Sequence, residues 1–410
     1  MTALADALAA LSTPEGIAQP YPHYARLREL SPVHPTPSGV LLTRYEDCVA
    51  VTRDPGYHAQ NAAWMDQRRP DWREHPGLRA TTESFLFLDP PDHTRLRRLV
   101  AGAFTQRRAA ALRTYVGALT ERVLDTIAAQ GKDGAVVDLH EVLAAGLPIA
   151  VIGKVLGVPE EDQPALREPL EGLRLAVDGG GKDAHLDVID RAGAALTGYF
   201  GELAARRRAD PRDDVTSALV AAMDPGADER PLTQDELEQT LTLVFSAAIE
   251  SMVDMLLNGV AALLAHPEQL ALLRADPGLI GGAVEEMLRY DTPVQAMARV
   301  AGEDQVIGGV PLPAGRQAVL MLGAANRDPA AFPDPDVFDI TRTGASVLSF
   351  GGGVHHCLGA PLARMQAVVF FPALLARFPQ LAAAGAPVRR GTVLRGFSDF
   401  PVTVSPATVC

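Results

Sequence analysis

Hydrophobic and polar positions along the chain predict a mainly helical protein. Alanine-rich stretches with apolar residues at helical spacing dominate, and alanine has the highest helix propensity. Segments with a strand-like pattern are short and lie mainly late in the sequence, at residues 294–300, 317–322 and 393–404. They are too few for a doubly wound parallel sheet. We therefore expect a mainly α fold with small β-sheets, in a single domain that spans residues 1–410.

One long helix is predicted in the second half of the chain. Thr233 followed by Glu236 fits a capping box, in which each side chain satisfies a backbone amide of the first turn. An apolar run then covers residues 237–265, and His266-Pro267 ends it. Such a helix is roughly 45–50 Å long. Because it is apolar on most faces, we expect it to cross the interior of the protein.

A polar stripe interrupts this apolar helix. Glu250, Asp254 and Asn258 follow one another at a spacing of four residues, so they share one face of the helix. This interruption also argues against a transmembrane segment. The stripe indicates either a polar partner or functional cavity inside the protein, or the solvated face of an ordinary helix.

Composition, charge and cysteine spacing narrow the class of protein. The chain has 410 residues and a net charge of −13, so no excess of Lys and Arg is present for non-specific binding of nucleic acid. Cys48, Cys357 and Cys410 lie far apart and form no C-x-x-C pair, which argues against a disulfide scaffold or a structural zinc site. The first ten residues lack the basic segment of a signal peptide. We expect a cytoplasmic protein that does not associate with membranes.

Cys357 is the strongest candidate for chemistry. Three glycines at 351–353 precede it, and an apolar helical pattern begins beside it. A cysteine at a helix N-terminus is biased toward the thiolate, which suits a single axial bond to haem iron. The adjacent His356 cannot easily join Cys357 on one metal ion, so zinc is disfavoured. Two other interpretations are a buried structural thiol and a glycine-rich turn that cradles a phosphate.

The segment around Cys357 resembles the haem-binding signature of cytochromes P450, F-G-x-G-x-[H/R]-x-C-x-G. The match holds at every defined position: Phe350, Gly351, Gly353, His355, Cys357 and Gly359. The resemblance extends across nearly the whole chain and is to the soluble bacterial type. It implies the P450 fold, with haem b between the long central helix and the cysteine-bearing loop and helix. It also implies that the Cys357 thiolate is the axial ligand.

Two further groups of residues match the family. Glu286 and Arg289 resemble its E-x-x-R motif, and Arg342 matches the arginine that completes this structural ion-pair network. His93 and Arg97 resemble its propionate-binding H-x-x-x-R, and Arg299 matches another propionate-binding arginine. The resemblance implies that these three residues and His355 bind the two haem carboxylates. Taken singly, each is equally well a surface charge.

The oxygen-binding stretch of the long helix departs from the family pattern. The usual A-G-x-[D/E]-T appears here as residues 247–251, with Ala248 in place of Gly, Glu250 kept, and Ser251 in place of Thr. The resemblance implies that Glu250 and Ser251 relay protons to bound dioxygen through ordered water. Ser251 lacks the methyl group that restricts a threonine rotamer, so its hydroxyl is placed more loosely. Alternatively, Ser251 hydrogen-bonds within the helix.

The resemblance also implies substrate contacts and partners. Substrate residues by family position are mostly apolar: Trp64, Phe87, Leu243, Val244, Ala247, Ala248, Val294, Met297 and Phe397. Residues 94–113 hold six arginines and no acid, which forms either a docking site for an acidic ferredoxin or a solvated helix face. Electrons would come from NAD(P)H through a ferredoxin reductase and ferredoxin. We expect a monomer.

The functional hypothesis is a haem-thiolate monooxygenase. It would insert one oxygen atom of O2 into a mainly apolar organic substrate, in secondary-metabolite biosynthesis. Ala248 and Ser251 leave room for an alternative, in which the same fold catalyses oxidative coupling, cyclisation or desaturation. A third hypothesis is a haem-binding sensor without turnover.

Overall fold

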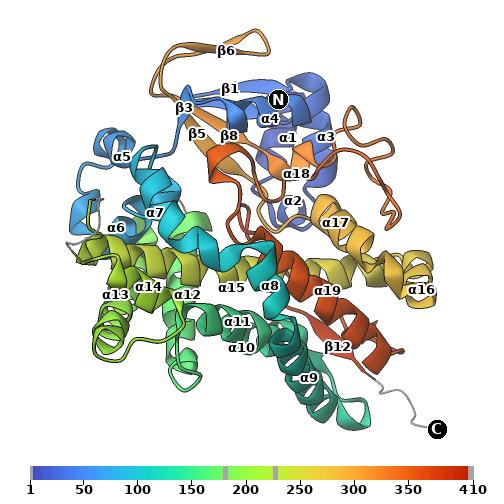
Figure 1. The fold of residues 1–410 in the computed structure, drawn as a ribbon. Helices are drawn as coiled ribbons and strands as arrows, with labels where there is room; N and C mark the ends of the chain where they lie inside the picture. The colour runs from blue at the N-terminus through green and yellow to red at the C-terminus, as the bar shows by residue number, and fades with distance from the viewer. Residues whose placement is uncertain (1–2, 179–182, 225–229, 405–410) are drawn as a thin grey trace. The chain divides into compact units, whose positions relative to one another are not determined.

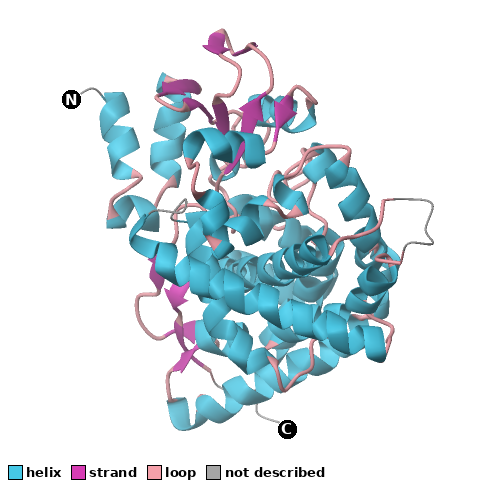
Figure 2. Cartoon of the chain, turned by 90° about the vertical axis from the view of Figure 1, so that its left-hand side faces the viewer, coloured by secondary structure: helices cyan, strands magenta, loops and turns pink. Residues whose placement is uncertain are grey.

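Helices make up most of the protein, and short strands gather in small sheets (Figure 2). The structure is a computed structural model that describes residues 3–178, 183–224 and 230–404. Cys410 therefore lies outside the described residues. The chain packs into two compact units. Unit 1 holds residues 1–57, 112–144 and 251–410, and unit 2 holds residues 58–111 and 145–250.

Unit 1 contains a five-stranded sheet built from both ends of the chain. Its order is β1-β2-β8-β5-β3, with β2 and β8 parallel and the β1–β2 and β5–β8 pairs antiparallel. The bounds are β1 (Val33–Thr36), β2 (Gly39–Leu42), β3 (Tyr57–His58), β5 (Met297–Ala301) and β8 (Gln317–Leu320). Early strands, blue in Figure 1, thus lie beside late strands, which are orange. Alternate residues such as Val40 and Leu320 are buried in the core.

The predicted strand at 393–404 was wrong as a single element. It divides into β11 (Gly396–Asp399), which pairs with β10 (Val388–Arg390), and β12 (Pro401–Thr403), which pairs with β4 (Val137–Asp138) and β9 (Ala382–Ala383). The remaining strands, β6 (Gln305–Ile307) and β7 (Val310–Leu312), form a hairpin. The break falls at Phe400, which is buried between the two strands. An apolar strand pattern does not show which partner each half takes.

Helices complete unit 1. They are α1 (Ala3–Ala10), α2 (Pro14–Ala18), α3 (Tyr21–Leu30), α4 (Tyr45–Arg53), α9 (Arg113–Gln130), α10 (Leu139–Ala145), α16 (Pro267–Ala275), α17 (Ile280–Tyr290), α18 (Leu322–Ala325) and α19 (Ala360–Arg377). Helix α19 packs on α9 and α17. Its Phe370 and Phe371 are fully buried, which anchors the helix that follows Cys357.

Unit 2 is helical. Its helices are α5 (Ala62–Arg68), α6 (Pro76–Thr82), α7 (Asp92–Ala101), α8 (Gln106–Ala111), α11 (Leu147–Leu156), α12 (Gln163–Asp178), α13 (Leu186–Ala209) and α14 (Val215–Ala221). Helix α13 packs on α6, α12 and α14. Its backbone meets α6 closely, because a Cβ added at Gly193 would lie 2.4 Å from the Cα of Gly77.

The predicted long helix is confirmed as α15 (Gln234–Ala265), which has 32 residues. The capping box is also confirmed. The Thr233 amide donates to the Glu236 carboxylate at 3.0 Å, and the Glu236 amide donates to the Thr233 hydroxyl at 3.2 Å. Residues up to Glu250 belong to unit 2, and those from Ser251 belong to unit 1.

The polar stripe on α15 is buried, so its interpretation as a solvated face is wrong. Glu250, Asp254 and Asn258 are at most 8% exposed. Asp254 pairs with Arg390 at 3.3 Å, and Asn258 accepts a hydrogen bond from Arg389 at 2.7 Å. The alternative prediction of buried polar partners is therefore confirmed.

Two stretches have the length and hydropathy of a membrane-crossing helix. They are Leu139–Leu156 and Gln234–Ala265, and 67% and 72% of their apolar windows are buried inside the protein. Core helices of soluble proteins pass the same test, so these stretches are weak evidence for a membrane span.

Candidate active site

The loop that carries Cys357 is shaped by two left-handed glycines. Gly351 and Gly353 have φ of 65° and 63°, a region that residues with a Cβ rarely adopt. A Cβ at Gly353 would also lie 1.9 Å from the carbonyl oxygen of Thr52 on α4. The loop closes where the Cys357 amide donates to the Phe350 carbonyl at 2.9 Å. Cys357 is exposed and lies two residues before Gly359, the N-cap of α19.

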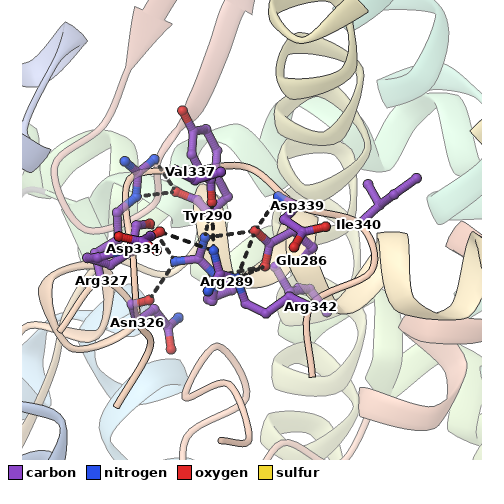
Figure 3. A network of polar contacts seen from close by, with 12 residues as sticks. Glu286, Arg289, Tyr290, Asn326, Arg327, Asp334, Val337, Asp339, Ile340 and Arg342 are labelled. Atoms are coloured by element: carbon purple, nitrogen blue, oxygen red, sulfur yellow. Dashed lines mark hydrogen bonds and ion pairs between the residues drawn. The ribbon is translucent and has the colours of Figure 1, made fainter. Parts of the chain in front are cut away.

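A buried ion-pair network lies in unit 1 where α17 meets the loop before Cys357 (Figure 3). Arg289 makes two hydrogen bonds to the Glu286 carboxylate, at 2.7 and 2.8 Å. Arg342 approaches the same carboxylate to 3.2 Å. The structure therefore brings together the three residues that the sequence predicted as one network. Glu286 and Arg289 are nearly inaccessible to water, which strengthens their mutual attraction.

The arginines of this network hold the irregular chain between α18 and the cysteine loop. Arg289 donates to the carbonyls of Asn326, Pro335 and Val337. The Asn326 side chain in turn donates to the Ser349 hydroxyl at 2.9 Å and accepts from the Leu348 amide at 2.7 Å. The network thus fixes the backbone immediately before Phe350.

Two supporting residues of the loop were not predicted from the sequence. One is Asn326, whose partners lie more than 20 residues away in the chain. The other is Arg364, whose guanidinium lies 4.4 Å from the centre of the Phe350 ring. Arg364 also forms two hydrogen bonds to Glu285, at 2.5 and 3.0 Å. Its position about two helical turns after Cys357 was the available sequence signal.

The four predicted carboxylate-binding residues are divided between the units. In unit 1, Arg299 is buried on β5 and donates to the Ala298 carbonyl at 2.9 Å, and His355 is half-buried beside Cys357. In unit 2, α7 carries His93, which is buried, and Arg97, which is half-buried. The spacing of four residues places His93 and Arg97 on one face of α7. Their convergence on one ligand with Arg299 and His355 stays a prediction.

The predicted oxygen-side residues occupy successive turns of α15. Leu243, Ala247 and Ser251 lie on one helical face and are more accessible than the residues around them, whereas Val244 is buried. Glu250 is buried, and its carboxylate lies 4.0 Å from Arg174 Nε on α12, within unit 2. Arg174 also pairs with Asp178.

The predicted substrate residues of unit 1 lie on apposed segments. Val294 forms a β-bridge with Leu394, a residue that the sequence did not single out. Met297 adjoins the cysteine loop, because a Cβ at Gly351 would lie 3.7 Å from its sulfur. Phe397 is buried beneath Arg389, whose guanidinium lies 3.8 Å from the ring centre.

The predicted substrate residues of unit 2 lie on several elements. Trp64 is half-buried on α5, and Phe87 is half-buried in the 3₁₀ turn at Phe85–Phe87. Arg68 lies over the Trp64 ring at 5.7 Å. Ala248 is half-buried on α15.

Comparison with known proteins establishes the family. A cytochrome P450 family model matches residues 279–387. The cytochrome P450 monooxygenase PikC of Streptomyces venezuelae is 39% identical over 395 residues, which cover 94% of this chain and 91% of PikC. The bacillaene polyketide synthase cytochrome P450 PksS of Bacillus subtilis 168 aligns with a TM-score of 0.84 and 34% identity, over 96% of this chain and 99% of PksS. CYP164A2 of Mycobacterium smegmatis with econazole bound aligns with a TM-score of 0.87 and 37% identity, over 97% of this chain and 99% of CYP164A2.

The chain belongs to the cytochrome P450 family, and its predicted fold class is confirmed. It is a P450 monooxygenase, an enzyme of a family that uses haem with a thiolate ligand and acts on small molecules with O2.

The residues around Cys357 fit a haem by the chemistry of their donors. A thiolate ligand has to be accessible, and Cys357 is exposed beside the N-terminus of α19, where the helix dipole favours the thiolate. Cys48 is a poorer ligand, because burial raises the pKa of its thiol. Gly359 keeps space beside the thiol, because a Cβ there would lie 3.9 Å from the Cys357 sulfur.

Proposed function

We propose that this protein is a haem b monooxygenase, with residues 1–410 acting as one P450 domain and the Cys357 thiolate as the axial ligand. The observation that carries the proposal is the loop of residues 350–359, which presents one exposed thiol at a helix start. When bound, the haem supplies the binding and reductive activation of O2. Glycine conformations, the Asn326 hydrogen bonds and the Arg364 contact with Phe350 hold the thiol in place.

The proposed haem contacts include cations for its two carboxylates. His93 and Arg97 on α7 would bind from one segment, and Arg299 and His355 from another. Hydrogen bonds between arginine and a carboxylate are charge-assisted and directional, so they set the orientation of the ring as well as its affinity. The remaining motif residues, Phe350, Gly351, Gly353 and Gly359, shape the loop.

Proton delivery is proposed for Glu250 and Ser251. A buried carboxylate and a neighbouring hydroxyl can pass a proton through ordered water while bulk water stays out. Arg174, 4.0 Å from Glu250, would help to hold the carboxylate in place on α15. Ser251 would hold the proton at Oγ, one residue further along the helix.

The proposed reaction is insertion of one oxygen atom into a mainly apolar organic substrate in secondary metabolism. Apolar side chains at Leu243, Ala247, Val294 and Met297 support an apolar substrate. The similarity to PksS supports the setting. We further propose a cytoplasmic monomer that receives electrons from NAD(P)H through a reductase and ferredoxin. Exposed Arg98, Arg107 and Arg108 support an acidic redox partner.

A second candidate is an atypical oxidation such as coupling, cyclisation or desaturation. Ala248 and Ser251 favour it, because both alter the stretch that receives oxygen and water. Analysis of the products separates the two, since hydroxylation adds one oxygen atom to the substrate and these reactions add none. A haem sensor without turnover would consume no O2 in the presence of ferredoxin.

Replacing Cys357 tests the proposal. Cys357→Ser should abolish the reduced, carbon-monoxide-bound absorption that is typical of thiolate-ligated haem, because a serine hydroxyl is a poor ligand at neutral pH. Cys48→Ala is the matched control, since it removes the buried thiol and should keep the thiolate absorption. A thiolate spectrum that persists in Cys357→Ser would overturn the ligand assignment.

A further inference from the structure

A buried charge cluster lies in unit 1 among the elements that carry Val294, Met297 and Phe397. Asp291, at the end of α17, accepts hydrogen bonds from Tyr21 at 2.6 Å and from Arg389 and Arg395 at 2.7 Å each. Burial opposes its ionisation, but the two guanidiniums outweigh burial and hold the pKa of Asp291 well below its ordinary value. Asp291 is therefore a buried carboxylate at neutral pH.

The cluster continues onto α15. Arg390 pairs with Asp254 at 3.3 Å, so three guanidiniums share two carboxylates in the protein interior. A Cβ at Gly396 would lie 1.6 Å from Asp254 Oδ1, which shows how closely β11 approaches the helix. Buried charges are tolerated only when their partners are correctly placed, so such a cluster penalises any other geometry.

Arg389 joins three elements through its side chain, whereas Arg395, inside the turn, also accepts a hydrogen bond from Asn258 Nδ2 through its backbone carbonyl at 3.0 Å. One of its terminal nitrogens donates to Asn258 Oδ1 on α15 at 2.7 Å, and the other donates to Asp291 Oδ2 at 2.7 Å. Its guanidinium plane also lies 3.8 Å from the Phe397 ring centre, directly across the β10–β11 ladder. A planar fork can make all three contacts at once, whereas a lysine ammonium cannot.

The β10–β11 hairpin, which Arg389 fixes, is hydrogen-bonded to residues 293–297, the predicted substrate wall. The Gln295 amide donates to the Val393 carbonyl at 2.8 Å, and the Arg395 amide donates to the Pro293 carbonyl at 2.7 Å. Val294 and Leu394 thus face each other across a β-bridge, and both are half-buried. Three residues after Val294, strand β5 begins at Met297, beside Gly351 of the cysteine loop.

The cluster also fixes the position of this wall relative to Ser251 on α15. Asn258 follows Ser251 by seven residues, about two turns, so both lie on similar sides of one rigid helix. A shift of the 391–395 turn against α15 would therefore change the distance between a substrate held by the wall and Ser251.

We propose that Arg389 is a positioning residue for substrate, which sets the register of the 391–395 turn and the 293–297 segment against helix α15. This inference rests on the proposed haem enzyme, whose pocket the wall would line. Arg389 touches neither substrate nor haem in this proposal. It acts through Asn258, Asp291 and Phe397, and it thereby sets which large ligands fit above the iron.

Two iron-binding probes of different size test the proposal. Imidazole reports access to the iron, and econazole, which carries an imidazole ring on a large apolar body, also reports the pocket wall. In Soret titrations of the holoenzyme, Arg389→Lys should weaken econazole by about tenfold, the scale of a small change of fit in an apolar pocket. Its imidazole affinity should stay within about twofold. Amides of residues 391–395 should exchange hydrogen faster.

Arg207→Lys is the matched control, because Arg207 forms a buried ion pair with Asp214 at 2.6 Å in unit 2, away from this cluster. It should leave the affinities of both probes unchanged. If Arg389→Lys does not fold, Asn258→Ser removes the Arg389 contact together with the amide's own hydrogen bonds to the Asp291 and Arg395 carbonyls, and it should give the same difference between econazole and imidazole. Equal econazole affinity, or unchanged exchange of the turn, overturns the proposal. A wild-type protein whose Soret band ignores imidazole would instead contradict the haem assignment, and the exchange measurement would still test the positioning role.

Discussion

Single residues show how environment decides what a side chain can do. Cys48 and Cys357 are chemically the same, but Cys48 is fully buried and burial raises the pKa of its thiol. Cys357 lies at an exposed loop that glycines allow to form. Motif residues were predictable from the sequence because the loop is local. Asn326 and Arg364 were not, since their roles depend on partners 14–79 residues away.

At the scale of single residues, Ser251 gives a prediction about how tightly NAD(P)H consumption is coupled to product formation. Ser251→Ala should raise peroxide release per NAD(P)H consumed, because it removes the hydroxyl that we propose relays protons. Positioned acid–base groups contribute about 10²–10⁴-fold, so partial loss should lower product per NAD(P)H by about tenfold. The measurement is simultaneous assay of NAD(P)H, peroxide and product. Ser251→Thr restores the hydroxyl with a restricted rotamer and should keep or improve coupling. Unchanged coupling in Ser251→Ala would count against the relay.

Elements were predictable where one segment contains its own signals. The long helix α15 has its capping box, apolar run and terminating proline in one stretch, and the structure begins and ends it at Gln234 and Ala265. Strands depend on partners elsewhere. The β1–β2 hairpin at the N-terminal end was not predicted, because a run such as Val33–Thr36 has little apolar alternation and gains its place by pairing with β2, which in turn joins β8.

A histidine that joins two helices of unit 2 predicts that their contact depends on pH. His75, just before α6, binds Asp190 on α13 at 2.7 Å and lies 3.5 Å from Asp71. The hydrogen bond to Asp190 raises the pKa of His75, although partial burial opposes this. A raised pKa in the folded state means that the contact stabilises fully below the unfolded value of about 6.5 and is lost as pH rises through the folded value.

We therefore expect the α6 amides to exchange hydrogen faster, after correction for intrinsic rates, as the pH rises above about 6.5. His75→Gln should abolish this pH dependence, and Asp190→Asn should do the same from the other side of the contact. Hydrogen exchange followed by mass spectrometry makes the comparison from about pH 6 to about pH 9, which covers the range in which a histidine with a raised pKa loses its proton. A pH dependence that survives in both variants would assign it to other groups.

At the scale of the whole molecule, charge is unevenly distributed. The chain carries a net charge of −13, yet α7 and α8 expose Arg98, Arg107 and Arg108. Association steered by such a patch weakens as salt screens it.

Arg107→Glu with Arg108→Glu should slow reduction by an acidic ferredoxin about tenfold at low salt and flatten the salt dependence. Stopped-flow reduction at several ionic strengths measures this. Reversal of exposed Arg208 and Arg212 is the control, with the same change of net charge elsewhere in unit 2. Equal slowing in both double variants would mean that net charge, and not this patch, governs the reaction.

The contact between the cysteine loop and α4 has a consequence for synthesis of the protein on the ribosome. Gly353 rests against Thr52, and 301 residues (353 − 52) separate them in the chain. After α4 has been synthesised, this contact cannot form until most of the remaining sequence has also been synthesised. Chains are synthesised at about 5–20 residues per second, so the delay is roughly 15–60 seconds. Acquisition of the prosthetic group is then a late event in the life of the new polypeptide, and it follows synthesis of nearly the entire protein.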